Sequence, residues 1–302
     1  MSFAPRPSFQ WLLRTRSLVL GERTLIMGIL NVTPDSFSDG GRFAALDAAV
    51  AHALDMLDHG ADMVDLGGES TRPNATPIAV EEEQRRVVPV IKAILRERPQ
   101  AVLSVDTFHA ATARAAIAAG AEIVNDVSGL HWDEHMPATC AEMACGTVLM
   151  HARGTPQQWS SLQPLSRDEI TPTVVEGLEE TLALAERAGI VRERIVLDPG
   201  IGFGKRGDEN YTLLAHLSAL KGFNLPILVG LSRKGFLGQT VAEAANLARV
   251  YKGVPPAAEK RLSATIAGNV AAILAGAHIV RVHDVQAAAE AAAIADSILR
   301  CG

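Results

Sequence analysis

The sequence predicts a single-domain α/β protein with the (β/α)8, or TIM-barrel, fold, and three observations support this prediction. Eight short runs of aliphatic and β-branched residues alternate with longer, Ala-rich segments that have helical periodicity. Glycine follows four of the helical segments, where a left-handed C-cap is expected. No low-complexity linker divides the 302 residues, and α/β barrels of this length commonly form one domain. An open, doubly wound sheet is the alternative that the alternation leaves open.

The expected elements follow one another in strict order along the chain. A leader over residues 1–22 is expected to precede one barrel domain over residues 23–302, and its lack of a continuous apolar stretch argues against a signal peptide. The strands are expected at 24–30, 63–66, 102–105, 123–125, 148–150, 195–197, 227–229 and 279–282. Helical patterns cover 44–59, 80–98, 110–119, 168–188 and 262–275, and the expected capping glycines are Gly60, Gly120, Gly189 and Gly276.

Composition excludes several classes of partner. The net charge of −6 gives no general attraction for nucleic acid or for acidic membranes, so an anionic ligand would need a local group of cations. No run of residues offers the ~18 uninterrupted apolar positions of a membrane span. The three cysteines lack C-x-x-C spacing, which argues against a zinc site or disulfides and favours a reducing compartment. We therefore expect a cytoplasmic protein.

Polar residues stand at the ends of almost all the expected strands. Active sites of TIM barrels are built at the carboxyl ends of the strands and in the loops that follow. A single Asp at such a position is more often a helix cap or a turn former, but a polar group at nearly every strand end indicates a ring around the barrel mouth. Such a ring suits a flat heterocycle with many hydrogen-bond donors and acceptors. The strand ends carry Asn31, Asp106, Asn125, Asp126, His151, Asp198, Lys234, Arg281, His283 and Asp284.

Eight segments, in this order, resemble the signature motifs of the dihydropteroate synthase family. They are GILNVTPDSFSDGG, GGESTRP, SVDT, NDVSG, LMH, LDPGIGFGK, LSRK and RVHD, and the resemblance runs from about Leu25 to the last helix. It implies a TIM-barrel enzyme of folate biosynthesis that condenses 6-hydroxymethyl-7,8-dihydropterin pyrophosphate with p-aminobenzoate, giving 7,8-dihydropteroate and pyrophosphate. It also implies a dissociative reaction, in which the bond to pyrophosphate breaks before the amine attacks.

The resemblance assigns the pterin ring to residues spread over most of the chain. Asp198 would accept from the 2-amino group and the adjacent ring N–H, Asn125 would contact another part of the ring edge, and Asp106 would accept a ring N–H. Lys234 would donate to the carbonyl side of the ring. The apolar walls would be Val127, Met150, Phe203 and Gly230, although ordinary core packing is the alternative for Val127 and Met150.

The pyrophosphate group is assigned by the same resemblance. Arg281 and His283 lie two residues apart on the last strand, so both side chains point to one side. Asn31 would be the protein ligand of a Mg²⁺ ion, which prefers oxygen donors and retains waters. Thr71 and Arg72 would also contact the pyrophosphate. The residues nearest the chemistry would then be Lys234, Arg281, His283 and Asp106.

Two loops are expected to close over the aminobenzoate. The resemblance places Asp35, Phe37 and Asp39 on the first loop and Pro73 on the second. It also places Gly235 near the aminobenzoate carboxylate, where family members often carry Ser or Arg; a backbone N–H or a helix N-terminus at Gly235 could still bind that carboxylate.

Other functions remain open at this point. A pterin-binding methyltransferase domain would share the barrel but would not need the first two loops or the Arg281–His283 pair. A catalytically silent pterin-binding homologue is the second alternative. The segment 200–205 lacks the spacing of a phosphate-binding or dinucleotide loop. We expect a homodimer, formed through the late helical segments 262–275 and 286–299.

Overall fold

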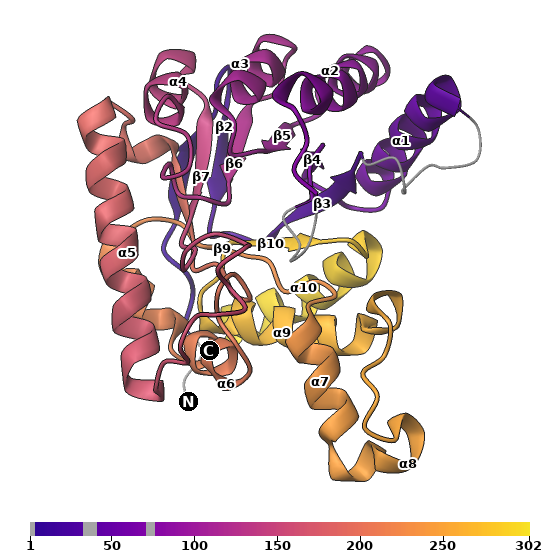
Figure 1. Ribbon diagram of the computed structural model, residues 1–302, viewed down its shortest axis with the longest axis vertical. Coiled ribbons are helices and arrows are strands. Elements are labelled where there is room, and N and C mark those ends of the chain that lie inside the picture. The colour runs from indigo at the N-terminus through magenta and orange to yellow at the C-terminus, as the bar shows by residue number, and fades with distance from the viewer. Residues whose placement is uncertain (1–3, 33–40, 71–75) are drawn as a thin grey trace.

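Eight parallel strands form a barrel that is surrounded by helices, as the sequence predicts (Figure 1). The computed structural model describes residues 4–32, 41–70 and 76–302. The hydrogen-bonded order of the strands is β8-β7-β6-β5-β4-β3-β10-β9. The ring closes where Leu197 of β8 bridges Ile227, and where the Leu197 N–H donates to the Pro226 carbonyl at 2.9 Å. This closure excludes the open sheet. The barrel strands are β3 (Leu25–Asn31), β4 (Met63–Gly67), β5 (Leu103–Asp106), β6 (Ile123–Asp126), β7 (Gly146–Met150), β8 (Ile195–Asp198), β9 (Leu228–Val229) and β10 (Ile279–Val282).

The helices follow the strands in the expected alternation. The helix over 262–275 has the bounds that its apolar spacing predicts, and the capping residues Gly189 and Gly276 have φ of 88° and 118°, in the left-handed region that favours glycine. Strand β9 begins one residue later than expected, at Leu228, because the Ile227 N–H donates to His278 Nδ1 at 3.1 Å. Helices α7 and α8 extend away from the barrel (Figure 1). The helices are α1 (Gly41–Asp58), α2 (Val80–Glu97), α3 (Ala110–Ala118), α4 (Met136–Met143), α5 (Arg167–Ala188), α6 (Asp208–Ala215), α7 (Gly235–Glu243), α8 (Ala248–Tyr251), α9 (Leu262–Ala275) and α10 (Val285–Cys301).

Two separate apolar layers build the core, because consecutive strand residues point to opposite faces. Outward residues such as Leu66, Val105 and Val280 pack against the helices. Inward residues such as Met27, Met63 and Val148 fill the amino-terminal half of the barrel interior. The inward positions of the carboxyl-terminal half are polar, and there the candidate site lies. No helix in the described part of the chain is long and apolar enough to span a membrane.

The segment before the barrel forms an antiparallel hairpin that the sequence did not indicate. Its strands are β1 (Phe9–Leu12) and β2 (Ser17–Leu20), and each is only four residues long. Trp11, Leu13 and Leu20 are buried against the inward apolar layer. The expected leader therefore closes the amino-terminal end of the barrel, opposite the polar strand ends.

The Trp11 side chain should be a major contributor to stability. It is 1% exposed, and its indole N–H donates to the Arg194 carbonyl at 2.8 Å. We expect Trp11→Ala to lower the free energy of unfolding by about 3–5 kcal/mol, through the lost burial and the cavity that remains. Urea denaturation measures this. The matched control is Val19→Ala on the same hairpin, which is 52% exposed and should change stability by less than about 0.5 kcal/mol; equal losses in the two variants would show that Trp11 does not close the barrel.

Candidate active site

A buried guanidinium paired with two carboxylates forms the centre of the site. Arg281 Nε donates to Asp65 Oδ2 at 2.6 Å, and Arg281 Nη2 donates to Asp106 Oδ2. The three side chains come from β10, β4 and β5 and point inward. Burial disfavours the charge on Arg281, but Asp65 and Asp106 outweigh this effect and raise its pKa. Arg281 therefore stays charged at the barrel mouth.

The carboxyl group of Asp106 titrates near neutral pH. Burial raises the pKa of Asp106 to about 7, with further raising by Asp65 and Glu83, although Arg281 acts in the opposite direction. Asp106 can thus lose or gain a proton in the pH range where most enzymes work. Such a shift is common in active sites.

Asn125 joins the same group from β6. Its Nδ2 donates to Asp65 Oδ2 at 2.8 Å, so one carboxylate oxygen accepts from both Asn125 and Arg281. Its neighbour Asp126 points outward, where it accepts from the N–H groups of Ser128 and Leu130 at 2.8 Å. Asp126 is therefore a loop-shaping residue outside the site, and only Asn125 belongs to the site.

Asp198 and Lys234 form the second half of the site. Asp198 accepts from the Gly200 N–H at 2.7 Å, and burial raises the pKa of Asp198 even though Lys234 opposes this. Burial lowers the pKa of Lys234 to about 8. Lys234 Nζ donates to the Ile201 carbonyl and lies 4.2 Å from the centre of the Phe203 ring. Arg281 acts electrostatically on both Asp198 and Lys234, so the two halves form one rim.

The loop between β8 and α6 is held by an internal lysine. Lys205 is 5% exposed, and its Nζ donates to the carbonyls of His151, Gly200 and Phe203 at 2.9, 2.8 and 3.2 Å. This lysine is fully used by the backbone, so 200–205 is not a phosphate-binding loop, in agreement with its spacing. The loop instead positions Phe203 beside Lys234.

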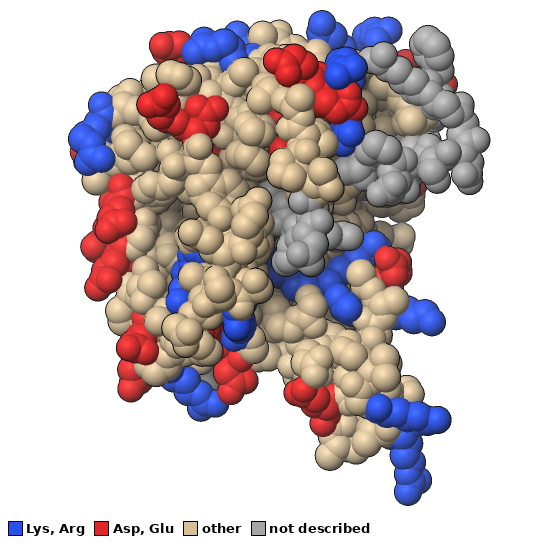
Figure 2. Space-filling view, in the orientation of Figure 1, with Lys and Arg blue, Asp and Glu red and all other residues tan. Residues whose placement is uncertain are grey.

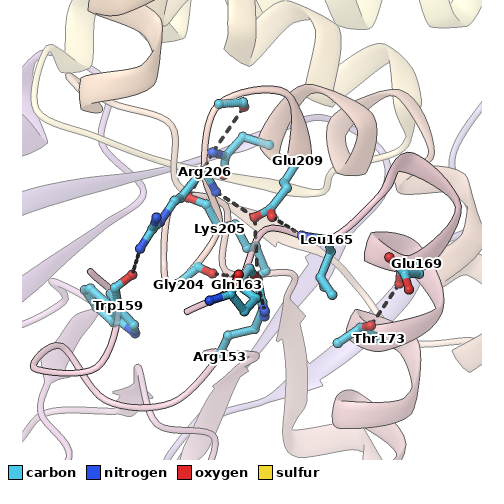
Figure 3. Close-up of polar contacts among 12 residues, drawn as sticks. Arg153, Trp159, Gln163, Leu165, Glu169, Thr173, Gly204, Lys205, Arg206 and Glu209 are labelled. Atoms are coloured by element: carbon cyan, nitrogen blue, oxygen red, sulfur yellow. Dashed lines mark hydrogen bonds and ion pairs between the residues drawn. The ribbon is translucent and has the colours of Figure 1, made fainter. Parts of the chain in front are cut away.

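Glu209 ties the loops after β7 and β8 together (Figure 3). Its carboxylate accepts from the N–H groups of Leu165 and Arg206 at 2.6 and 2.7 Å and lies 3.6 Å from Arg153 Nη1. Arg153 in turn donates to the Gly204 carbonyl at 3.2 Å. The strand-end residue His151 is buried against Gly177 of α5, and burial lowers its pKa to about 2. His151 therefore supports the loops as a neutral group and lies outside the polar ring.

The expected apolar walls lie at the same end of the barrel. Val127 and Met150 are buried but belong to neither apolar layer of the core, as a wall of the site requires. Among the described atoms, a Cβ added at Gly230 would meet only the Arg281 Cβ, at 3.8 Å, so the glycine leaves room beside the guanidinium. Strand β10 ends at Val282, so His283 lies just beyond the strand on which it was expected, and its Nδ1 is 2.9 Å from Ser232 Oγ. Figure 2 shows one group of Lys and Arg side chains near the middle of this face, in addition to others along its edges.

Asn31 stands where the resemblance expects a metal ligand. A Cβ atom added at Gly67 would lie 3.8 Å from Asn31 Oδ1 and 3.7 Å from Asp106 Oδ2, so both oxygens face the space that this glycine leaves open. An all-oxygen donor set with room for water fits Mg²⁺.

A second group of metal-ligating types exists among the described residues. One ligand atom each of Glu69, Glu83 and His109 lie within 4.8 Å of one another. His109 Nε2 is 3.2 Å from Glu69 Oε2, and Glu83 Oε2 accepts from Thr107 Oγ1 at 3.1 Å. These contacts join the segment after β4 to α2 and to the start of α3.

The structure brings together most of the predicted site and adds two residues. Asp106, Asn125, Asp198, Lys234 and Arg281 share one rim. Asp65 was missed, and Ser232 was noted after the seventh strand but given no role; for Asp65 the signal was a lone carboxylate inside an otherwise apolar strand. The remaining predicted residues lie outside the described residues: Asp35, Phe37, Asp39, Thr71, Arg72 and Pro73.

Comparison with known proteins agrees with this geometry. The model of the pterin binding enzyme family matches residues 27–283. A dihydropteroate synthase from Synechocystis is 41% identical over 280 residues, which cover 93% of this chain and 92% of the relative. The solved dihydropteroate synthase of Clostridium difficile with pteroic acid is 42% identical, with a TM-score of 0.82 over 93% of this chain and 98% of that one. That of Xanthomonas albilineans with 4-aminobenzoic acid is 40% identical, with a TM-score of 0.84 over 97% of this chain and 98% of that one. The chain belongs to the dihydropteroate synthase family of pterin binding enzymes.

Proposed function

We propose that this chain condenses 6-hydroxymethyl-7,8-dihydropterin pyrophosphate with p-aminobenzoate to form 7,8-dihydropteroate and pyrophosphate. The observation that carries the proposal is the single rim, where acceptors for a ring edge stand beside a buried guanidinium that suits a diphosphate. Solved relatives with pteroic acid and with 4-aminobenzoic acid support both halves of the product. The same relatives favour the synthase over the methyltransferase and over a silent homologue.

The ring would be held by hydrogen bonds to its polar edge. Asp198 offers two acceptor oxygens that suit an amino group with an adjacent ring N–H. Ionised Asp106 accepts a further ring N–H, and Lys234 donates to the carbonyl side. Phe203, Met150 and Val127 enclose the faces of the ring and exclude water, which strengthens these polar contacts.

Departure of the diphosphate requires stabilisation of its growing negative charge. Arg281 presents a planar fork of donors that matches phosphate oxygens, and His283, which directly follows β10, would add a further donor. The C–O bond breaks, the ring delocalises the positive charge of the methylene group, and the aminobenzoate nitrogen attacks. The protein contributes positioning and electrostatic stabilisation and needs no nucleophile of its own.

We also propose a Mg²⁺ ion, held by the Asn31 amide oxygen together with diphosphate oxygens and waters. It would supply additional neutralisation of the leaving group. A homodimer and a cytoplasmic location are part of the same proposal. Exposed apolar side chains on the late helices, Leu262, Ile294 and Ile298, support the dimer, and three free thiols support a reducing compartment.

The proposed reaction predicts release of pyrophosphate together with formation of dihydropteroate. Incubation with the pterin pyrophosphate, p-aminobenzoate and Mg²⁺ should give both products in equal amounts, and chelation of Mg²⁺ should abolish the reaction. Arg281→Met should lower kcat/KM on the order of a thousandfold, because it removes donors to the leaving group. Arg249→Ala on the exposed helix α8 is the control and should leave the rate unchanged. Pterin binding without product in the wild type would instead identify a silent homologue.

The glycine at position 235 should bind the aminobenzoate carboxylate more weakly than a serine at that position would. Helix α7 begins at Gly235, and a Cβ atom added there would meet no atom of the described residues within 4 Å, so they leave room for a serine side chain. We expect Gly235→Ser to lower the KM for p-aminobenzoate roughly threefold to tenfold through an added hydrogen bond to the carboxylate. The inhibition constant of a sulfonamide, which competes for the same place, should change by a different factor. Kinetics identical to the wild type for both ligands would remove this role of residue 235.

The pH profile of kcat/KM should be bell-shaped, with its maximum between about 7 and 8. Asp106 accepts a ring N–H most strongly when ionised, so activity should fall as the pH drops below its pKa of about 7. Lys234 donates best when charged, so activity should also fall as the pH rises above its pKa of about 8. Initial rates at low substrate measure the profile. Lys234→Arg, whose charge persists, should lose the alkaline limb and keep the acidic one; an unchanged alkaline limb would assign it to another group.

A further inference from the structure

We infer that Asp65 is a positioning residue that turns the Asn125 amide and thereby determines which ring edge the site accepts. This inference rests on the proposed function, because it concerns the ring-binding half of that site. Asp65 is fully buried inside the barrel, at 0% exposure. On β4 it is the inward-facing residue two positions before Gly67, so it lies deeper in the barrel than the expected ring.

The chemistry of Asp65 allows only one orientation of Asn125. Arg281 Nε donates to Asp65 Oδ2 at 2.6 Å, so this oxygen acts as an acceptor. A carboxylate oxygen accepts hydrogen bonds, so the Asn125 amide presents its amino group to it. The observed bond from Asn125 Nδ2 to Asp65 Oδ2, at 2.8 Å, is the one that this constraint requires. The reverse orientation would place two oxygens against each other.

The opposite end of the Asn125 amide is left for the ligand. Its Oδ1 accepts no hydrogen bond from the described residues, and it is not among their enclosed polar atoms without a partner. This oxygen is therefore not fully enclosed by the described residues and remains an acceptor for a ligand. Asp198 is also an acceptor, so this part of the site requires a ring edge that carries N–H donors, such as an amino group next to a ring N–H.

The same carboxylate connects the ring to the leaving group. Asp65 Oδ2 accepts from Asn125 on one side and from Arg281 on the other, whereas Asp65 Oδ1 is enclosed and has no partner in the part of the chain that the structure describes. An enclosed carboxylate oxygen without a partner is unfavourable for folding. Stability alone therefore does not account for a carboxylate here, but the simultaneous orientation of an amide and a guanidinium does.

The test compares two ring probes that differ at one group. A pterin carries an amino donor at ring position 2, and the corresponding lumazine carries a carbonyl acceptor there. Their dissociation constants, measured by ring fluorescence without turnover, give a discrimination ratio. We expect the wild type to prefer the pterin by about a hundredfold, and Asp65→Val to lower this ratio at least about tenfold, because the freed amide can turn its amino group to the carbonyl.

Two further variants keep the test decisive. Ser104→Ala changes another buried polar side chain of the barrel interior, one that has no partner among residues 4–32, 41–70 and 76–302, and should leave the ratio unchanged. Asn125→Asp should bind pterin weakly, because it sets two carboxylates side by side. Combining it with Asp65→Asn restores one donor between positions 65 and 125, and the double variant should regain about tenfold or more of the lost affinity.

The outcomes separate this inference from the proposed function. Equal weakening of both probes in Asp65→Val, with an unchanged ratio and no recovery in the double variant, would show that Asp65 is only a structural residue. Failure of the wild type to form dihydropteroate would overturn the proposed function, yet the binding ratio would still test Asp65, since it requires no turnover.

Discussion

In a parallel barrel, consecutive strand residues point alternately inward and outward, and this alternation decides which polar side chains of the chain can meet a ligand. Met63, Asp65 and Gly67 of β4 face the interior, and so do Ile279 and Arg281 of β10. The inward positions change from apolar to polar along each of these strands. One half of the barrel interior therefore supplies stability, and the other half is left for chemistry.

The same alternation explains which polar strand ends serve other purposes. Asp126 and His151 follow inward residues and so face outward, where they shape loops and pack against helices. Thr107, directly after Asp106, also faces away from the site and contacts Glu83. A polar residue at a strand end is thus part of the site only at alternate positions, and the others position the loops that surround it.

Much of this arrangement could be predicted from the sequence. The alternation of short strands and capped helices gave the fold, and the rule that sites form at carboxyl strand ends found Asp106, Asn125, Asp198 and Arg281 before any contact was known. Asp65 could not be found in this way, since it lies inside a strand and its partner Arg281 is 216 positions away. The hairpin from Phe9 to Leu20 was missed because four-residue strands carry too little periodicity.

The buried charges of the site are balanced so that ligand binding and proton loss are linked. The site places three carboxyl groups beside two cations: Asp65, Asp106 and Asp198 face Arg281 and Lys234. Burial raises the pKa of Asp106 toward neutrality, which favours its protonated form and reduces the excess of negative charge. A diphosphate bound at Arg281 would compete with Asp106 for the guanidinium, because Nη2 of Arg281 now donates to Asp106. The Asp106 carboxylate would then need another donor, and a ring N–H can supply it. Ring and diphosphate are therefore expected to bind more favourably as one molecule than as two separate fragments. The ring N–H gives Asp106 a new donor when the diphosphate takes Arg281, and the diphosphate gives Arg281 a new acceptor when the ring takes Asp106.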